Sequence, residues 1–304
     1  MAASHWPALP DWADTRDTLH LWTQIVGKIR LAHAPWTNHS WHSPLYVTPR
    51  GLTTSAIPHG TRLFSIDFDF VDHQLVIDAG HERRTFPLRA QSVAAFYEAV
   101  MSAMADLGLA VEIHGTPNEI PDPIPFAEDT VHASYDAEAA ERFAASLQQA
   151  HRVLTAFRAR FTGKSSPVHF FWGSFDLAVT RFSGRPAPEH PGGIPNLPDW
   201  ITREAYSEEV SSIGLWYGDG THGPLFYSYA YPPPEGFAEA PVRPEAARYE
   251  PALSEFVLPY ESVREPGDAA LVAFAESTYE AAARLADWDE LETPPPAEAR
   301  PHPF

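Results

Sequence analysis

Residues that could do chemistry gather first in the segment NHSWH at residues 38–42. Its two histidines, His39 and His42, are separated by two residues, one of which is Trp41. On a loop or a helical turn this spacing can place both imidazoles on one metal ion, whereas a regular strand would point them to opposite faces. The segment therefore predicts either a ligand or general-base site at His39 and His42, or a histidine pair that is hydrogen-bonded at the start of a strand.

A second group of polar side chains interrupts the apolar run Val168–Phe182. A carboxylate such as Asp176 is rarely buried in such a run without a partner, and Arg181 or a nearby histidine could supply one. Period-two alternation places Trp172 and Asp176 on one face of the strand. His169 and Arg181 then fall on the other face. Two interpretations follow: a pocket-lining strand, in which Asp176 orients a catalytic group and Arg181 clamps an anion, or a structural ion pair.

Two further candidate sites come from a loop and from the first predicted helix. The sequence HPGG at residues 190–193 lies in a Pro- and Gly-rich loop, where glycines either let the backbone approach a ligand or simply form a turn. Lys28 is one of only two lysines among 21 basic residues, and its compact charge is one that arginine does not offer. We count His190 as a catalytic candidate. The ligand-binding candidates are Trp41, Trp172, Lys28, Gly192 and Gly193.

Asp67 and Asp69 share one face of the predicted strand Leu63–Phe70. Two carboxylates at this spacing could hold a divalent cation or divide acid and base roles. The alternative is a solvated polar face, because apolar side chains alternate with them on the other face. The chain has no cysteine, so any metal site must use histidine and carboxylate ligands. If a divalent metal is bound, the candidate ligands are His39, His42, Asp67 and Asp69.

The composition excludes several classes of function. The 304 residues include 40 acidic and 21 basic side chains, a formal net charge of −19, which disfavours binding to nucleic acids and to anionic membranes. The absence of cysteine excludes disulfides and thiolate nucleophiles. The dinucleotide, P-loop and nucleophile-elbow motifs are absent, so no nucleotide cofactor is predicted. The sequence shows neither a secretory signal nor an apolar stretch long enough for a membrane span, so we expect a soluble cytoplasmic protein.

Periodicity predicts the elements that must position these residues. The alternation of short strands with long helices predicts an α+β protein with antiparallel sheets flanked by long amphipathic helices. Asp14 is expected to cap the first helix, and a short helix at Asp199–Val210 would carry Glu204, Glu208 and Glu209. Long helices are predicted at Thr15–Ala32, Gln91–Leu107, Ala137–Phe161 and Asp268–Trp288. Strands are predicted at Leu45–Thr48, Leu63–Phe70, Gln74–Ile77, Arg83–Leu88, Val168–Phe182 (one strand or a pair), Leu225–Tyr231 and Phe256–Leu258, with a loop at Ser183–Pro198.

The two halves of the chain repeat one order of predicted elements: a helix, a Trp-containing strand, an aromatic strand and a closing helix. This order favours either an ancient duplication of a helix–sheet–helix module, which would make Trp41 and Trp172 equivalent, or chance convergence. A site could lie where the modules meet, whether they stay separate or form one compact domain. The predicted parts are an extended segment (1–13), a first module (14–117), a Pro- and Asp-rich connector (118–135), a second module (136–292) and a disordered Pro-rich tail (293–304).

Several longer stretches resemble an uncharacterised bacterial family that is known as a domain of unknown function. The resemblance extends over nearly the whole chain, from about Trp6 to Trp288. It implies no activity, cofactor or catalytic residue, so every functional expectation rests on the residues themselves. The stretches are WTQIVGKIRLAHAPWTNHSWHSPLYV, IDFDFVDHQL, PIPFAEDTVHASYD, GKSSPVHFFWGSFDLAVTRFSGR and HPGGIPNLP.

These patterns favour an enzyme or a small-molecule-binding protein whose pocket uses residues 38–42, the strand around Trp172 and the HPGG loop. His39 or His42 would then act as a base or metal ligand. This expectation requires four histidines to meet in one cavity: His39, His42, His169 and His190. The alternative is a non-catalytic interaction protein that docks a partner on its acidic last third, because residues 201–304 hold 19 acidic and 6 basic side chains.

Overall fold

The computed structural model describes residues 6–9 and 11–288. In this part of the chain six α-helices accompany two antiparallel sheets of six strands each, so the predicted α+β fold is confirmed. The predicted tail at 293–304 and part of the predicted N-terminal segment lie outside the described residues. The helices are α1 (Ala13–His33), α2 (Val93–Asp106), α3 (Ala137–Arg158), α4 (Asp199–Ala205), α5 (Glu261–Arg264) and α6 (Asp268–Leu285), with 3-10 turns η1 (Asn38–Ser40) and η2 (Phe126–Glu128).

The first sheet has the strand order β1-β2-β4-β5-β6, and β3 pairs with β4 beside this path. It is built around β4, whose alternating apolar residues are buried as predicted. The two very short strands β2 and β3 were not predicted, because three residues are too few for a periodic pattern. The strands are β1 (Tyr46–Thr48), β2 (Gly51–Thr53), β3 (Ile57–His59), β4 (Arg62–Asp69), β5 (Gln74–Asp78) and β6 (Arg83–Pro87).

The second sheet has the strand order β11-β12-β10-β9-β8-β7. The predicted apolar run Val168–Phe182 forms a strand pair, β7 and β8, because the chain turns between them with Phe175 at a φ of 59°. Strand β8 continues to Pro186, into the predicted loop. The strands are β7 (His169–Phe171), β8 (Asp176–Pro186), β9 (Glu208–Trp216), β10 (Leu225–Tyr231), β11 (Arg248–Glu250) and β12 (Glu255–Pro259).

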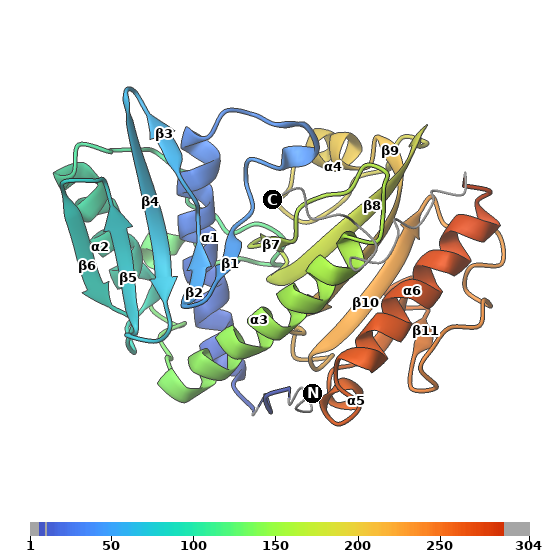
Figure 1. Ribbon diagram of the computed structural model, residues 1–304. Helices are drawn as coiled ribbons and strands as arrows, with labels where there is room; N and C mark the ends of the chain where they lie inside the picture. The colour runs from blue at the N-terminus through green and yellow to red at the C-terminus, as the bar shows by residue number, and fades with distance from the viewer. Residues whose placement is uncertain (1–5, 10, 289–304) are drawn as a thin grey trace, which may run out of the picture.

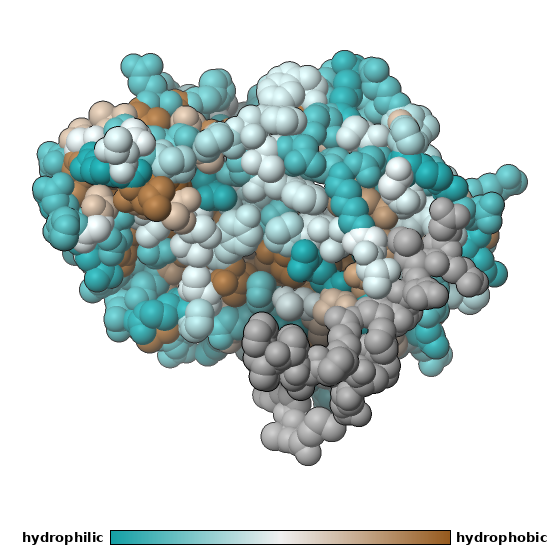
Figure 2. Space-filling model, turned by 45° about the horizontal axis from the view of Figure 1, so that its top comes forward, coloured by the Kyte–Doolittle hydropathy of each residue, from teal (hydrophilic) through white to brown (hydrophobic). Residues whose placement is uncertain are grey.

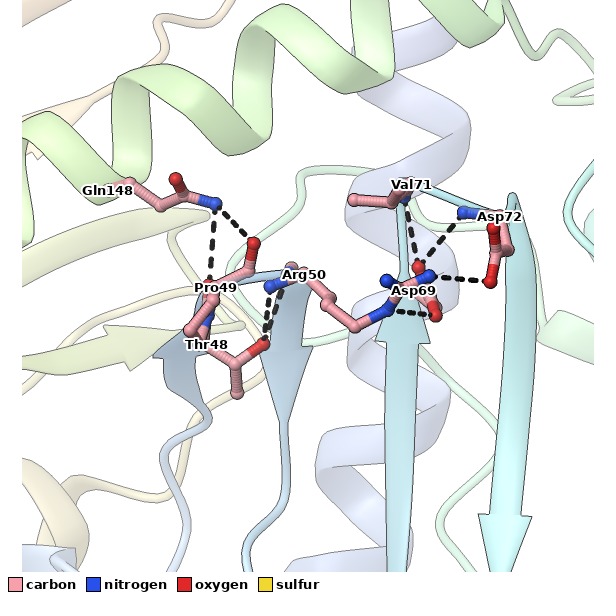
Figure 3. A network of polar contacts seen from close by, with 8 residues as sticks. Thr48, Pro49, Arg50, Asp69, Val71, Asp72 and Gln148 are labelled. Carbon is pink, nitrogen blue, oxygen red and sulfur yellow. Dashed lines mark hydrogen bonds and ion pairs between the residues drawn. The ribbon is translucent and has the colours of Figure 1, made fainter.

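The two sheets meet at their edges, where Leu45 pairs with Phe170 through two backbone hydrogen bonds of 2.9 Å. Helix α3 crosses the front of this junction, and α6 lies along the second sheet (Figure 1). The side-chain amide of Gln148 on α3 donates to the carbonyl oxygen of Pro49 at 3.0 Å, which fastens α3 to the turn between β1 and β2 (Figure 3). One hydrophobic core therefore runs through both halves of the chain.

Helix α1 shows the predicted apolar stripe, and its central part is buried. Trp22 stacks on Phe96 of α2 with ring centroids 4.5 Å apart. The predicted cap is wrong, because the helix begins at Ala13 after Trp12, which makes no side-chain cap. Asp14 lies instead in the first turn, where its charge still complements the helix dipole.

Two other local predictions are wrong. The predicted helix at Asp199–Val210 ends at Ala205, so Glu208 and Glu209 belong to strand β9. Strand β9 forms because β8 and β10 lie on either side of it and pair with it, which local sequence does not reveal. Trp41 lies in the turn before β1, not in a strand.

Candidate functional site

A pocket of about 450 Å³ lies on one face of the second sheet. Its floor comes from β8, β9 and β10, and its walls come from the segments around η1, the β7–β8 turn, Asn118–Glu119 and residues 194–206. The other face of the sheet carries α3 and α6, whose aromatic rings surround Arg181. Seen from the side of α4, the surface is largely hydrophilic, with apolar surface in small patches (Figure 2).

The antiparallel register brings polar side chains of three strands together on the pocket floor. Asp176 and Thr180 of β8 alternate with Ala178 on this face, as the period-two pattern predicts. Thr180 lies opposite Ser212 of β9, and their hydroxyl oxygens are 2.9 Å apart. Ser212 in turn pairs with Tyr229 of β10. The floor therefore carries a strip of polar and aromatic side chains that crosses three strands.

Asp176 is the most deeply buried acid of the pocket, with 5% of its surface exposed. The Tyr227 hydroxyl donates a hydrogen bond to Oδ2, whereas Oδ1 is buried without a hydrogen-bond partner among the described residues. Burial raises the pKa of Asp176 to about 7; the Tyr227 hydrogen bond opposes this rise and the charge of Glu119 adds to it. The carboxyl group can therefore donate or accept a proton near neutral pH.

Two further carboxyl groups share the pocket. Burial, with a smaller contribution from the charge of Asp176, raises the pKa of Glu255 to about 8. Burial also raises the pKa of Glu119, whose carboxylate accepts a hydrogen bond of 2.8 Å from Ser174. Glu119 can lie this close to the β7–β8 turn because residue 173 is glycine: a Cβ there would lie 2.0 Å from its Oε1. Among the described residues, neither lysine nor arginine lines the pocket.

Gly214 determines where the Tyr227 side chain lies. It stands on β9 between Ala178 of β8 and Tyr227 of β10. A Cβ at this position would lie 2.4 Å from the Tyr227 hydroxyl oxygen. The missing side chain therefore lets the Tyr227 ring cross β9 and reach Asp176 on β8. No motif in the sequence marks Gly214, Tyr227 or Glu255 as site residues; the alternation of tyrosines in β10 is the one local signal for them.

Aromatic rings from distant segments form much of the pocket wall. Trp41 and Trp172, both predicted to bind ligand, lie in this wall. The Trp172 indole donates to the carbonyl oxygen of Ser43 at 2.9 Å, and its ring packs where a Cβ of Gly27 would clash at 2.3 Å. The remaining rings are Phe171, Phe182, Tyr206, Trp216, Tyr227 and Tyr229.

A comparison of the sequence with protein-family models confirms the predicted resemblance to a family of unknown function. The model of the family of unknown function DUF5996 matches residues 6–293. The chain belongs to the DUF5996 family. It matches no curated protein and no solved structure. Within the described residues of this DUF5996 protein, no helix is long and apolar enough to cross a membrane.

Of the four histidines that were expected to meet, His39 lines the pocket of this DUF5996 protein. It is held at the edge of the pocket by several polar contacts. Its Nε2 accepts a hydrogen bond of 2.7 Å from Lys164, and its backbone NH donates to Glu204 at 2.7 Å. Its Nδ1 lies 3.2 Å from the carbonyl oxygen of Ala205, which sets Nδ1 as the protonated nitrogen. Lys164 is also paired with Glu208.

The other three histidines do not line the pocket. His42 accepts a hydrogen bond of 3.1 Å from the backbone of Thr37. His190 accepts one of 3.0 Å from the backbone of Gly192, and its ring stacks on Tyr206 at 4.8 Å. His169 is fully buried, and neither of its ring nitrogens has a hydrogen-bond partner in the described structure. The predicted convergence of four histidines on one cavity therefore does not occur.

Arg181 is buried on the opposite face of β8 from Asp176, as the alternation predicts. Its guanidinium lies 3.4 Å from the ring centroid of Phe157 and pairs with Glu276 at 3.6 Å. The predicted ion pair with Asp176 does not form, and Arg181 does not reach the pocket as an anion clamp. Lys28 also lies outside the lining residues, where its ammonium donates to the side chain of Asn118.

The two glycines of the HPGG loop form a turn in this structure. Gly192 and Gly193 have φ of 78° and 89°, which other residues rarely adopt. The backbone NH of Gly193 donates to the carboxylate of Asp199 at 2.9 Å. Neither glycine lines the pocket.

The predicted metal ligands are not brought together. Asp69 accepts hydrogen bonds from Arg50 at 2.6 Å and from the backbone of Val71 and Asp72 at 3.0 Å, so both of its oxygens are occupied (Figure 3). Asp67 accepts a hydrogen bond of 3.2 Å from Ser65 on the first sheet. His39 and His42 belong to the segment around η1. In the described part of the chain, no three histidine or carboxylate side chains gather as a metal site.

Several acidic side chains of the last third have partners within the protein. Glu209 pairs with Arg185 at 2.8 Å, and Glu276 pairs with Arg160 at 3.2 Å. Glu255 lines the pocket. These contacts distribute the charge of these acids over several elements, and the alternative of an acidic docking surface stays a prediction.

Proposed function

We propose that this DUF5996 protein binds a small organic molecule in the pocket on the second sheet, with Asp176 as its polar anchor. The observation that carries this proposal is the buried Oδ1 of Asp176, which has no hydrogen-bond partner among the described residues although Asp176 lines the pocket. An unpaired buried acceptor costs free energy, and a ligand that donates a hydrogen bond recovers it.

The size and lining of the pocket support the proposal. Its volume of about 450 Å³ falls within the usual range of small-molecule sites, ~300–1,000 Å³. Such sites combine apolar and aromatic walls with a few convergent polar groups, as Trp41, Trp172 and Asp176 do here. Because the Asp176 carboxyl group titrates near neutral pH, acid–base catalysis on the bound molecule is the enzymatic form of this proposal.

A thermal-shift screen of metabolites followed by calorimetry tests the proposal. Compounds that bind should raise the melting temperature of the native protein. Asp176→Asn preserves the shape of the side chain and should weaken binding by at least about tenfold, the loss expected for one hydrogen bond to a charged group. Asp67→Asn removes a carboxylate from the first sheet and should leave binding unchanged. The proposal fails if no compound stabilises the protein, or if the compounds that bind have the same affinity for Asp176→Asn as for the native protein.

A cytoplasmic location is also a proposal, based on the sequence features described above. Fractionation of cells that express the tagged protein tests it. Recovery in the soluble cytoplasmic fraction is the expected result, and recovery in the membrane or the medium would contradict it.

A further inference from the structure

We infer that the ligand of this pocket is an organic cation: a protonated amine whose N–H group donates to Oδ1 of Asp176 while its apolar body lies among the aromatic rings. This inference rests on the proposed function and specifies its ligand class. Four independent features of the pocket lead to it: its charge, its one vacant acceptor, its rings and its lack of a metal-binding donor set.

The charge of the pocket favours a cation. Three carboxyl groups, Asp176, Glu119 and Glu255, line it, and no lysine or arginine does so among the described residues. Two lysines lie behind rings of the pocket wall: Lys164, 4.7 Å from the Phe182 ring, is paired with Glu208, and Lys28, 5.9 Å from the Trp172 ring, donates to the Asn118 amide. A carboxylate or phosphate ligand would enter against three acids without a basic partner, whereas a cation compensates their charge.

The vacant acceptor favours a cation that carries a proton on nitrogen. Oδ2 of Asp176 accepts the Tyr227 hydrogen bond, and the nearby Ser174 hydroxyl donates its proton to Glu119 at 2.8 Å, so one oxygen of Asp176 remains for the ligand. One oxygen suits a single N–H donor, whereas a guanidinium is best matched by two. A quaternary ammonium has no N–H to donate and would leave Oδ1 unpaired. A primary, secondary or tertiary ammonium therefore fits best.

The rings around the acids favour an organic body over a metal ion. Trp216, Tyr227 and Tyr229 line the pocket with Asp176 and Glu255. Aromatic faces attract organic cations, and the interaction strengthens when water is excluded. A hard metal cation needs several oxygen ligands at once, and the described residues offer no group of three ligands arranged to bind one.

A matched set of probes tests the ligand class. Each probe keeps one body and changes the head group: 2-phenylethylamine, its alcohol 2-phenylethanol, the carboxylate 3-phenylpropanoate and the quaternary phenethyltrimethylammonium, together with aliphatic amines and alcohols of similar size. The amines should bind at least about tenfold more tightly than the alcohols and the quaternary compound, and the carboxylate should not bind measurably.

Two further readouts belong to the same experiment. Asp176→Asn should abolish the preference for amine over alcohol, whereas Asp67→Asn should retain it. Binding of an amine should also release about half a proton or more at pH 7, because a bound cation favours the ionised form of Asp176 and of its neighbours Glu119 and Glu255. Calorimetry in buffers of different ionisation enthalpy measures this release.

The outcomes separate the inference from the proposed function. If alcohols or carboxylates bind as tightly as amines and Asp176→Asn weakens them, the pocket is a ligand site but the ligand class is wrong. If amines bind without proton release or without dependence on Asp176, the inference is also wrong. If no head group in the set binds at all, the inference fails, and the absence of any metabolite hit in the wider screen would overturn the proposed function with it.

Discussion

Tyr227 and Asp176 belong to strands that are not neighbours, yet the Tyr227 hydroxyl donates a hydrogen bond to the Asp176 carboxylate. The Tyr227 side chain crosses β9 at Gly214, where a Cβ atom would occupy the space of the Tyr227 hydroxyl. The arrangement holds Oδ2 of Asp176 in place and leaves its buried Oδ1 without a hydrogen-bond partner among the described residues. It is the geometric basis for treating Asp176 as the anchor of a ligand.

The first prediction concerns Gly214→Ala. The new methyl group would meet the Tyr227 hydroxyl, so the ring must move away from Asp176. We expect a loss of about 1–3 kcal/mol in the free energy of unfolding, typical of overpacking, and weaker ligand binding. Gly223→Ala is the matched control, because a Cβ there meets nothing within 4 Å. Chemical denaturation measures the change, and equal stability of the two variants would contradict the role of Gly214.

The second prediction concerns pH and Glu255. Its pKa in the folded protein is about 8, whereas in the unfolded chain a glutamate titrates at about 4.3. Because the folded-state pKa is raised, the contribution of Glu255 to stability is fully present below pH ~4 and is lost as the pH rises through 8. Between pH 6.5 and 8.5 the native protein should lose about 1–2 kcal/mol more stability than Glu255→Gln.

The comparison with the variant cancels the contribution of titrating groups that do not interact with Glu255. Burial lowers the pKa of Lys28 to about 8, so its contribution to the stability of the protein increases as the pH rises through this range. The native protein and the variant share this increase. Denaturation curves at four pH values in the range provide the test. Parallel stability profiles for the two proteins would show that Glu255 is already ionised at pH 6.5.

The third prediction concerns His169, which is buried with both ring nitrogens unpartnered. Burial, aided by the charges of Arg30 and Arg158, lowers its pKa to about 3. The lowered folded-state pKa means that stability falls as the pH drops from about 6.5 toward 3. His169→Phe removes two unsatisfied polar atoms and should raise stability by about 1 kcal/mol at pH 7 and by more at pH 5.

Thermal unfolding of His169→Phe at both pH values measures this gain. A variant that is less stable at pH 5 than the native protein would show that His169 makes a polar contact of its own. Ligand binding should not change, because His169 does not line the pocket.

The fourth prediction separates Arg181 from the pocket. Its guanidinium lies between the rings of Phe157 and Tyr279 and donates to the carbonyl oxygen of Phe157. Arg181→Lys loses the planar stacking and should cost roughly 2–4 kcal/mol of stability. In the folded fraction, ligand affinity should stay within about twofold of the native value. Arg243→Lys at an exposed ion pair is the control and should change neither property.

A selective loss of binding in Arg181→Lys, measured by calorimetry under conditions where the variant is folded, would restore the anion-clamp interpretation. The unchanged circular dichroism of the variant under those conditions serves as the check on folding.

Local sequence was sufficient wherever one element buries a regular face. The alternation of β4 and the apolar stripe of α1 determine which side of each element is buried, so these elements and the α+β class could be predicted. The same alternation placed Asp176 and Arg181 on opposite faces of β8. The concentration of tryptophan at Trp41 and Trp172 also indicated two segments of the pocket wall.

The pairing of distant strands determines strand β9 and the grouping of the pocket residues. Strand β9 exists because β8 and β10 pair with it on both sides, and neither its length nor its charged start shows this in the sequence. The same pairing brings Gly214 under the ring of Tyr227 and sets Glu255, from the far strand β12, in the pocket that contains Asp176.

The sequence by itself determined the fold class, the buried faces and the presence of an acid on the pocket side of β8, because these depend on periodicity along one element. Only the tertiary structure decided which acids share a pocket and which bases are absent from it, because strand register is a relation between distant segments. It separated the four candidate histidines and assembled Tyr227, Asp176 and Glu255 instead. Their proximity, and the burial that raises their pKa values, follow from the packing of the whole sheet.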